Sequence, residues 1–283
     1  MEPKHHYYFC GFDTAPAQSA RADDGAIVVL RATPRHEAEE GALSERADDY
    51  AESALYARKI RNASARQWSG FLHLLDERFG GFSMIVGDPG GGGLFIRKEL
   101  GSSRQLIENA ERECTPIVTP DDPNAPVVAK YTLRLFKRGD TGIESVWPKL
   151  AGDDVLNDAA HGALREAIEH GHVVLPPDAR EWKRDQVAGW SEERQFALRN
   201  LSEMAAQLVN ITVATKDDGT YAFTKHNVRM FSARGRKDLA YAFMYAHVAF
   251  LIWLRQVGQE EMYGGGDDSM TMSWGPSSGG RRR

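Results

Sequence analysis

The chain has 283 residues, of which 42% are hydrophobic and 27% charged, and this composition excludes a chain that is disordered throughout. Its 35 Lys and Arg residues against 40 Asp and Glu residues give a net charge of −5, so binding to nucleic acid would need local basic patches. Two cysteines are too few for a disulfide scaffold or a four-cysteine zinc site and fit a reducing cytoplasm.

The N-terminal part of the chain predicts neighbouring strands followed by helices. Strands are indicated by short aromatic and β-branched runs that turn formers bound, and helices by apolar residues at helical spacing. Gly80 and Gly81 close the longest helical stretch. The expected elements are strands at 7–12, 25–35 and 82–87, one or two amphipathic helices within 49–79, a glycine-rich loop at 88–93 and a short helix at 94–100.

The C-terminal part predicts helices that alternate with short strands. An Asp-Gly pair at 218–219 favours a hairpin turn. The expected elements are strands at 116–119 and 172–177, helices at 159–169 and 192–209, a hairpin from 211–214 and 221–224, and an apolar helix from 238 to about 254. The last of these is shorter than the roughly 20 residues that cross a bilayer, so we expect a buried helix with a hydrogen-bonded core histidine, His247.

This order of elements is typical of an α/β fold with a mixed central sheet flanked by helices. We expect one domain over residues 1–258, with 120–155 as a possible insertion because that segment has no clear period. Residues 259–283 are rich in Gly, Ser and Asp and offer little to bury, so this tail is expected to be disordered.

Three aspartates lie where strands stop or helices start. Asp13 follows the first strand, Asp88 ends the strand at 82–87, and Asp238 opens the apolar helix. Carboxylates at about 4 Å repel by roughly 4 kcal/mol, so a cluster normally holds cations or protons. Oxygen ligands select Mg²⁺ or Mn²⁺, and two such ions can cleave a phosphodiester. Taken singly, each aspartate is better explained as a turn or cap residue, and the metal site rests on their joint pattern.

Basic residues precede the apolar helix. The segment 225–238 has a net charge of +4, with Asp238 as its one acid, and could grip a DNA backbone. The similar segment 130–150 is better explained as a solvated surface. His226 could orient a ligand or a water as an outer neighbour of the metal site. The predicted DNA-binding residues are Arg229, Arg234, Arg236 and Lys237.

The order of these motifs resembles the nuclease domain of phage terminase large subunits, which has a ribonuclease H-like fold. The resemblance lies in GFDTA at 11–15, MIVGDPGGGG at 84–93, HGHVVLP at 170–176 and KDLAYA at 237–242. The family often has two adjacent acids before its last helix, whereas this chain has Asp238 alone.

The resemblance implies an endonuclease that cuts concatemeric viral DNA during genome packaging. Asp13, Asp88 and Asp238 would be its catalytic residues and its ligands for Mg²⁺ or Mn²⁺, with two ions expected. The implied partners are double-stranded DNA, a packaging ATPase, the small terminase subunit and the portal, in the cytoplasm of the infected host cell and away from membranes. The Gly-x-x-x-x-Gly-Lys-Ser/Thr motif is absent, so no ATPase is expected in this chain, which is a separately encoded nuclease or an excised domain.

Two alternatives remain open on the sequence. One is a junction-resolvase-like nuclease of the same fold, which would prefer branched DNA. The other is a non-catalytic DNA-docking module of the packaging machine, whose acids are structural.

Overall fold

The computed structural model describes residues 6–14, 25–35, 44, 46–148, 153–176, 181–209, 211–215, 221–224 and 237–264. The strands are β1 Tyr7–Asp13, β2 Gly25–Pro34, β3 Tyr50–Ile60, β4 Met84–Gly87, β5 Arg104–Ile107, β6 Ala110–Glu113, β7 Leu133–Leu135, β8 Val173–Val174, β9 Thr212–Thr215 and β10 Tyr221–Thr224. The helices are α1 Ala65–Arg78, α2 Gly93–Leu100, α3 Thr141–Val146, α4 Asp153–Glu169, α5 Arg184–Val187, α6 Glu192–Val209 and α8 Asp238–Gly264, with a 3-10 turn η1 at Ala47–Asp49.

Six strands form the central sheet, in the order β7-β4-β1-β2-β3-β8. β2 is antiparallel to both β1 and β3, whereas β4 is parallel to β1 and β7 is parallel to β4. β8 adds to β3 in parallel through two residue pairs. This mixed sheet with helices on its faces confirms the fold class predicted from the sequence, an α/β sheet of the ribonuclease H-like kind.

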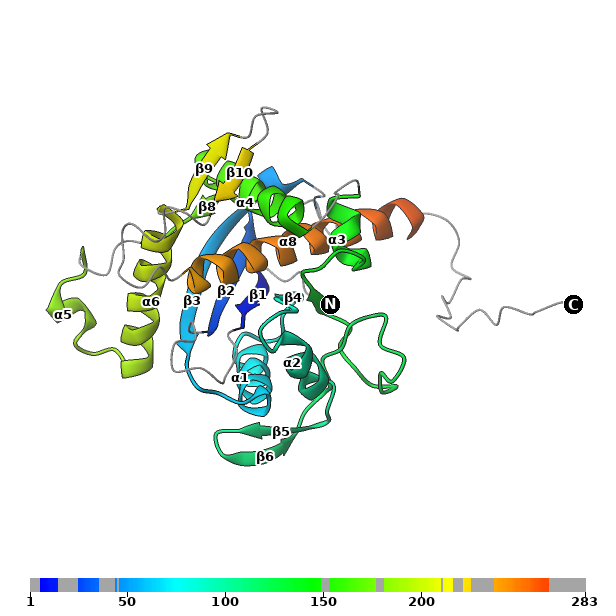
Figure 1. The fold of residues 1–283 in the computed structure, drawn as a ribbon. Coiled ribbons are helices and arrows are strands. Elements are labelled where there is room, and N and C mark those ends of the chain that lie inside the picture. The colour runs from blue at the N-terminus through cyan, green and yellow to red at the C-terminus, as the bar shows by residue number, and fades with distance from the viewer. Residues whose placement is uncertain are drawn as a thin grey trace, which may run out of the picture.

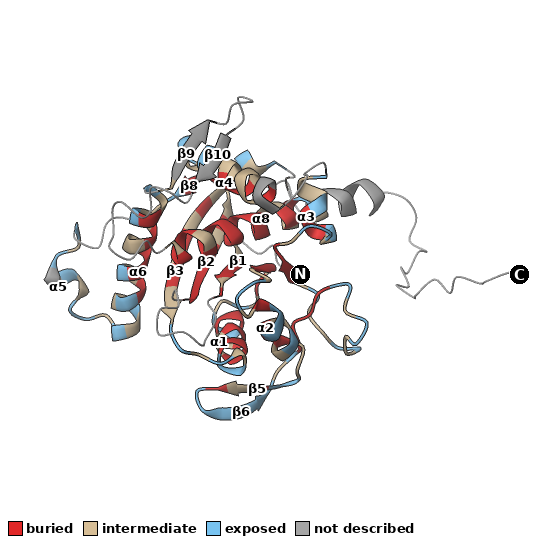
Figure 2. Cartoon of the chain, viewed as in Figure 1, coloured by how far each residue is buried: buried red, intermediate tan, exposed pale blue. Residues whose placement is uncertain are grey.

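The two faces of the sheet are covered by different helices (Figure 1). Because side chains alternate along a strand, Phe9 and Val86 join the core beneath α8, whereas Cys10 and Ile85 join the core on the side of α1 and α2. Buried residues are concentrated in the sheet and in α8, which runs across it (Figure 2). The molecule therefore has two apolar layers, one on each side of the sheet.

The helix α8 is buried along most of its described length, as the sequence predicted. It begins at Asp238 as expected but continues to Gly264, ten residues beyond the predicted end at 254. His247 is a hydrogen-bonded core histidine, as predicted, since its Nδ1 lies 2.8 Å from Oε2 of the equally buried Glu52. Within the described residues, no helix is both long and apolar enough to cross a membrane.

The prediction of one or two helices within 49–79 is half wrong. Residues 65–78 form α1, but residues 50–60 form β3, whose burial alternates from Tyr50 to Tyr56. Its alternation is hidden in the sequence because the charged residue Glu52 occupies an inward position, where it pairs with His247. Tertiary pairing with β2 over ten residue pairs decides for the strand.

Residues 104–155 depart most from the sequence prediction. The expected strand at 116–119 is reduced to a single bridge between Ile117 and Lys130. The segment 120–155, expected as a possible insertion, supplies β7 of the central sheet and the helix α3. The β5–β6 hairpin was not predicted. The other predicted helices and the β9–β10 hairpin are present, while the strand at 172–177 shrinks to β8.

Candidate active site

Asp13 ends β1 on the face of the sheet that α8 covers. Phe9 and Gly11 lie four and two residues before Asp13, so all three are on the same face of the strand. Phe9 and Gly11 contact α8 directly. A Cβ on Gly11 would lie 2.0 Å from the carbonyl oxygen of Ala242, so the helix backbone packs against bare strand backbone at this point. Glycine at this position therefore brings α8 close to Asp13.

Asp88 lies beside Asp13 at the end of the neighbouring parallel strand. Phe12 pairs with Gly87, and the N–H of Asp88 donates to the carbonyl of Phe12 at 3.0 Å. Continuing this register by one residue sets Asp13 opposite Asp88 on the same face, because the period of a strand is two. The two carboxylates thus come from adjacent strand ends, where strands lie roughly 5 Å apart.

Asp88 is half-buried and is fixed by its own loop. Its Oδ1 accepts a hydrogen bond from the N–H of Gly90 at 3.0 Å. Burial raises the pKa of the Asp88 carboxyl, while this hydrogen bond and the charge of Lys237 act in the opposite direction. Removal from water therefore disfavours the ionised form, and a nearby cation would favour it.

Asp238 opens α8 at the same end of the sheet. α8 runs antiparallel to β1, since Phe250 contacts Phe9 whereas Ala242, nearer the start of the helix, covers Gly11. Asp238 lies one turn before Ala242, which directs it toward the end of β1. It is 3% exposed and belongs to the first turn, where the helix dipole favours a negative charge.

The three aspartates share one end of the sheet but do not form a finished metal site. Among the described residues, no group of three or more His, Cys, Asp or Glu side chains is arranged to hold a metal ion. The donor set nevertheless fits a hard divalent cation in kind, because Asp13 and Asp88 supply carboxylate oxygens on one face and Asp238 lies at the same end.

Lys237 and two tyrosines of α8 surround the carboxylates. The Nζ of Lys237 lies 3.9 Å from the ring centroid of Tyr241, and its charge lowers the pKa of Asp88. Burial raises the pKa of the Tyr245 hydroxyl well above its ordinary value, and the charges of Asp13 and Asp88 raise it further. The phenol therefore stays neutral in an environment that both carboxylates influence.

Tyr245 was not predicted from the sequence. A signal existed, since positions 238, 241, 242 and 245 follow the spacing of one helix face. Its orientation depends on Phe136, which follows β7 and whose ring centroid lies 4.9 Å from that of Tyr245. Because β7 was not predicted, the neighbour that directs Tyr245 could not be inferred.

The glycine loop after Asp88 packs closely against the end of β1. The Thr14 hydroxyl donates to the carbonyl of Gly90 at 2.6 Å, and a Cβ on Gly91 would lie 2.5 Å from the carbonyl oxygen of Thr14. A Cβ on Gly93 would lie 1.7 Å from the carbonyl oxygen of Asp88. Close packing thus explains Gly91 and Gly93, and a positive φ of 132° explains Gly92.

The predicted basic residues are only partly described. Lys237 lies near Asp88, whereas the remaining residues proposed before the apolar helix fall outside the described ranges; these are His226, Arg229, Arg234 and Arg236. In the segment 130–150, which we assigned to a solvated surface, Lys130 pairs with Asp76 and Arg134 lies 4.0 Å from the buried carboxylate of Asp140. These two cationic side chains therefore interact with carboxylates of the protein itself.

The solved structures to which this chain is similar include two of the large terminase subunit of bacteriophage Sf6. No family model and no curated protein matches the chain. One structure is a point mutant of gp2c with calcium, at 11% identity and a TM-score of 0.45 over 86% of this chain and 88% of that chain. The other is the nuclease domain of gp2, at 12% identity and a TM-score of 0.44 over 86% and 87%.

Proposed function

We propose that the chain is a metal-dependent endonuclease that cuts double-stranded viral DNA during genome packaging. The observation that carries the proposal is the pairing of Asp13 and Asp88 at the carboxyl ends of two adjacent parallel strands, on the face where Asp238 opens α8. The motif resemblance to terminase nuclease domains supports the same assignment. A packaging ATPase, the small terminase subunit and the portal are the partners that this role implies.

Asp13, Asp88 and Asp238 would hold Mg²⁺ or Mn²⁺, with two ions expected. When bound, the ions would activate a water and stabilise the leaving oxygen of a phosphodiester. Gathering three carboxylates costs several kcal/mol of repulsion at an effective dielectric near 20, and bound cations would offset this cost. Burial raises the pKa of the Asp88 carboxyl, and a bound cation would lower it, as the charge of Lys237 does.

Lys237 supports DNA binding at this site. Its ammonium group lies over Tyr241, close enough to Asp88 to lower the pKa of that carboxyl. A phosphate approaching the carboxylates would therefore meet a cation beside them, which offsets the repulsion between the phosphate and the acids.

The test is nicking of supercoiled plasmid in Mg²⁺ or Mn²⁺ by the wild type and by Asp13→Asn, Asp88→Asn and Asp238→Asn. We expect each variant to lose nicking at least a hundredfold, because an amide removes the ligand charge while keeping the side-chain shape. Asp48→Asn is the matched control. Asp48 is exposed and precedes the amino end of β3, which lies at the end of the sheet opposite the three aspartates. Wild-type cutting by Asp88→Asn would refute the assignment.

A non-catalytic DNA-docking module is the second candidate. It is favoured by the finding that the described residues contain no assembled group of metal-binding side chains. This alternative predicts no uptake of Mn²⁺ in calorimetry and no cleavage at any metal concentration. The endonuclease instead predicts Mn²⁺ binding that Asp13→Asn and Asp88→Asn weaken together. Preference for branched DNA over linear duplex would indicate the resolvase-like nuclease.

A further inference from the structure

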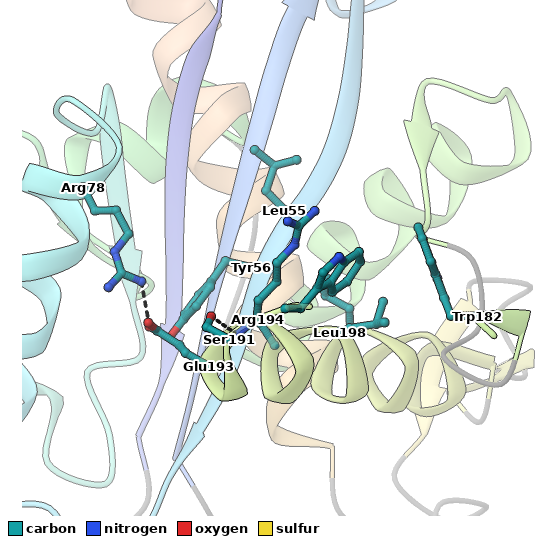
Figure 3. A pocket seen from close by; sticks show the side chains of 11 residues that line it. Leu55, Tyr56, Arg78, Trp182, Ser191, Glu193, Arg194 and Leu198 are labelled. Carbon is teal, nitrogen blue, oxygen red and sulfur yellow. Dashed lines mark hydrogen bonds and ion pairs between the residues drawn. The ribbon is translucent and has the colours of Figure 1, made fainter. Parts of the chain in front are cut away.

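A cavity of about 410 Å³ lies between β3 and the N-terminal half of α6. Its walls are largely apolar and aromatic and include Leu55, Trp182 and Trp190. Arg78 and Glu193 also line it and form an ion pair, with Nη1 and Oε1 2.6 Å apart (Figure 3). This volume and this kind of wall are typical of pockets that bind small planar or apolar groups.

A β-bulge directs Leu55 into the cavity. In the pairing of β2 with β3, Val29 lies opposite Tyr56 and Leu30 lies opposite Ala54, so Leu55 is the extra residue. A bulge turns a side chain away from the alternation of its strand. The cavity wall therefore depends on a local departure from regular sheet structure, as is common beside binding sites.

A second cavity of about 930 Å³ adjoins the first, since both are lined by Arg78 and Glu193. We name the two together the α6 groove. Three acids line it: Glu193 pairs with Arg78, Glu108 lies 3.3 Å from Arg112, and Glu192 is the third. The basic residues lining the α6 groove are all arginines, namely Arg58, Arg78, Arg194 and Arg199.

Two of these arginines lie over aromatic rings. The Cζ atom of Arg194 is 3.8 Å from the centroid of the Trp190 ring, and that of Arg58 is 4.5 Å from the centroid of Phe71. Phe196, on the same helix as Arg194, leaves 42% of its surface exposed in the groove. The groove thus contains both planar cationic groups and aromatic rings, and both kinds of group stack on nucleobases.

Trp182 adds a second indole ring to the cavity wall. Its ring centroid lies 5.2 Å from that of Trp190, and the two ring planes are tilted by 59°. The two indoles therefore present aromatic surface to a bound base.

We propose that the α6 groove binds a single nucleic-acid strand, with one base in the cavity beside Trp182 and Trp190 and the backbone phosphates along the arginines. The two indole rings would contact this base, and aromatic rings and guanidinium groups would stack on the neighbouring bases. A duplex fits poorly, because its bases are stacked inside the helix and cannot enter a cavity. The site does not depend on the proposed nuclease, since Asp13, Asp88 and Asp238 are not among the residues that line the groove.

The experiment titrates the full chain with a fluorescein-labelled oligothymidine of about 15 nucleotides in EDTA, following anisotropy and intrinsic tryptophan fluorescence. We expect salt-dependent binding with quenching of tryptophan, and a loss of affinity of about tenfold in both Trp190→Ala and Arg194→Gln. Arg194 is exposed, so its substitution tests the groove even if Trp190→Ala folds poorly. Arg165→Gln, an exposed arginine paired with Glu169 on α4, is the matched control and should bind as the wild type does.

Several outcomes would overturn the proposal: unchanged affinity in Arg194→Gln, equal affinity for a duplex of the same length, or displacement of the strand by oligoglutamate at equal charge. The last result would assign the groove to an acidic protein segment. Asp88→Asn should bind the strand normally, and Arg194→Gln should nick plasmid normally. A chain that binds the strand but never nicks plasmid would support the proposal for the groove and contradict the proposed nuclease.

Discussion

Gly11 decides how closely a helix approaches the candidate active site. The backbone of α8 passes so near that the missing side chain is a requirement: an added Cβ would lie 2.0 Å from the carbonyl oxygen of Ala242 and 2.3 Å from the nitrogen of Ala246. Both neighbours are backbone atoms of a buried helix, and neither can rotate away. The position of α8 over Asp13 therefore depends on this one residue.

We expect Gly11→Ala to destabilise the protein by about 3 kcal/mol or more, because a buried helix must shift to relieve the clash. The measurement is the urea midpoint of unfolding. Gly189→Ala is the control, since nothing lies within 4 Å of a Cβ at that position, and it should change stability by less than about 0.5 kcal/mol. Equal midpoints for the two variants would contradict the packing described here.

At the scale of elements, α4 packs against the first turns of α8 through a histidine. The ring of His161 meets that of Tyr241 edge to face, with centroids 4.9 Å apart. Burial, together with the charge of Lys237, lowers the pKa of His161 to about 4. The contact between these two helices is therefore made by a neutral imidazole.

This histidine makes stability depend on pH. The unfolded chain binds a proton near pH 6.5, whereas the folded chain binds it only near pH 4, so the contribution is fully present above pH 6.5 and is lost as pH falls toward 4. The loss should reach about 3 kcal/mol at most. His161→Phe should flatten this part of the profile of unfolding free energy against pH. His170→Phe, at an exposed position after the same helix, should leave the profile unchanged.

At the scale of the whole molecule, the candidate metal ligands tie the sheet to its covering helix. Asp13 and Asp88 belong to β1 and the end of β4, whereas Asp238 belongs to α8, so a shared cation would link elements about 225 residues apart in the chain. Such a link stabilises the folded state by binding it in preference to the unfolded chain.

We expect saturating Mn²⁺ to raise Tm by about 5 °C, since a ligand at a hundred times its Kd adds about 2.7 kcal/mol and each kcal/mol shifts a chain of this size by about 2 °C. Asp13→Asn and Asp88→Asn should each abolish most of the rise in a calorimetric scan. Asp48→Asn should keep it. A rise of the same size in all four proteins would mean that the ion binds elsewhere.

The strand β3 illustrates what made sequence prediction fail. Its inward residues include Glu52, whose charge predicts a position facing solvent. The structure shows that it is buried because it pairs with His247 of α8. The bulge at Leu55 then changes which face of the sheet the following residues occupy, and the alternation of burial breaks at Tyr56–Ala57. The strand β7 was missed for a different reason, because three residues are too few to show a period of two.

What the sequence determined by itself were local features: the strand β1, the glycine loop after β4, the helices α6 and α8, and the placing of Asp13, Asp88 and Asp238 at element ends. Turn formers, caps and apolar periodicity act over a few residues, so they can be read directly. Tertiary structure alone decided that Asp13 and Asp88 lie at the ends of adjacent parallel strands, that the charges of both act on Tyr245, and that the α6 groove exists. These arrangements depend on strand pairing and helix packing between residues far apart in the chain. Such contacts produce no periodic pattern in the sequence of either segment.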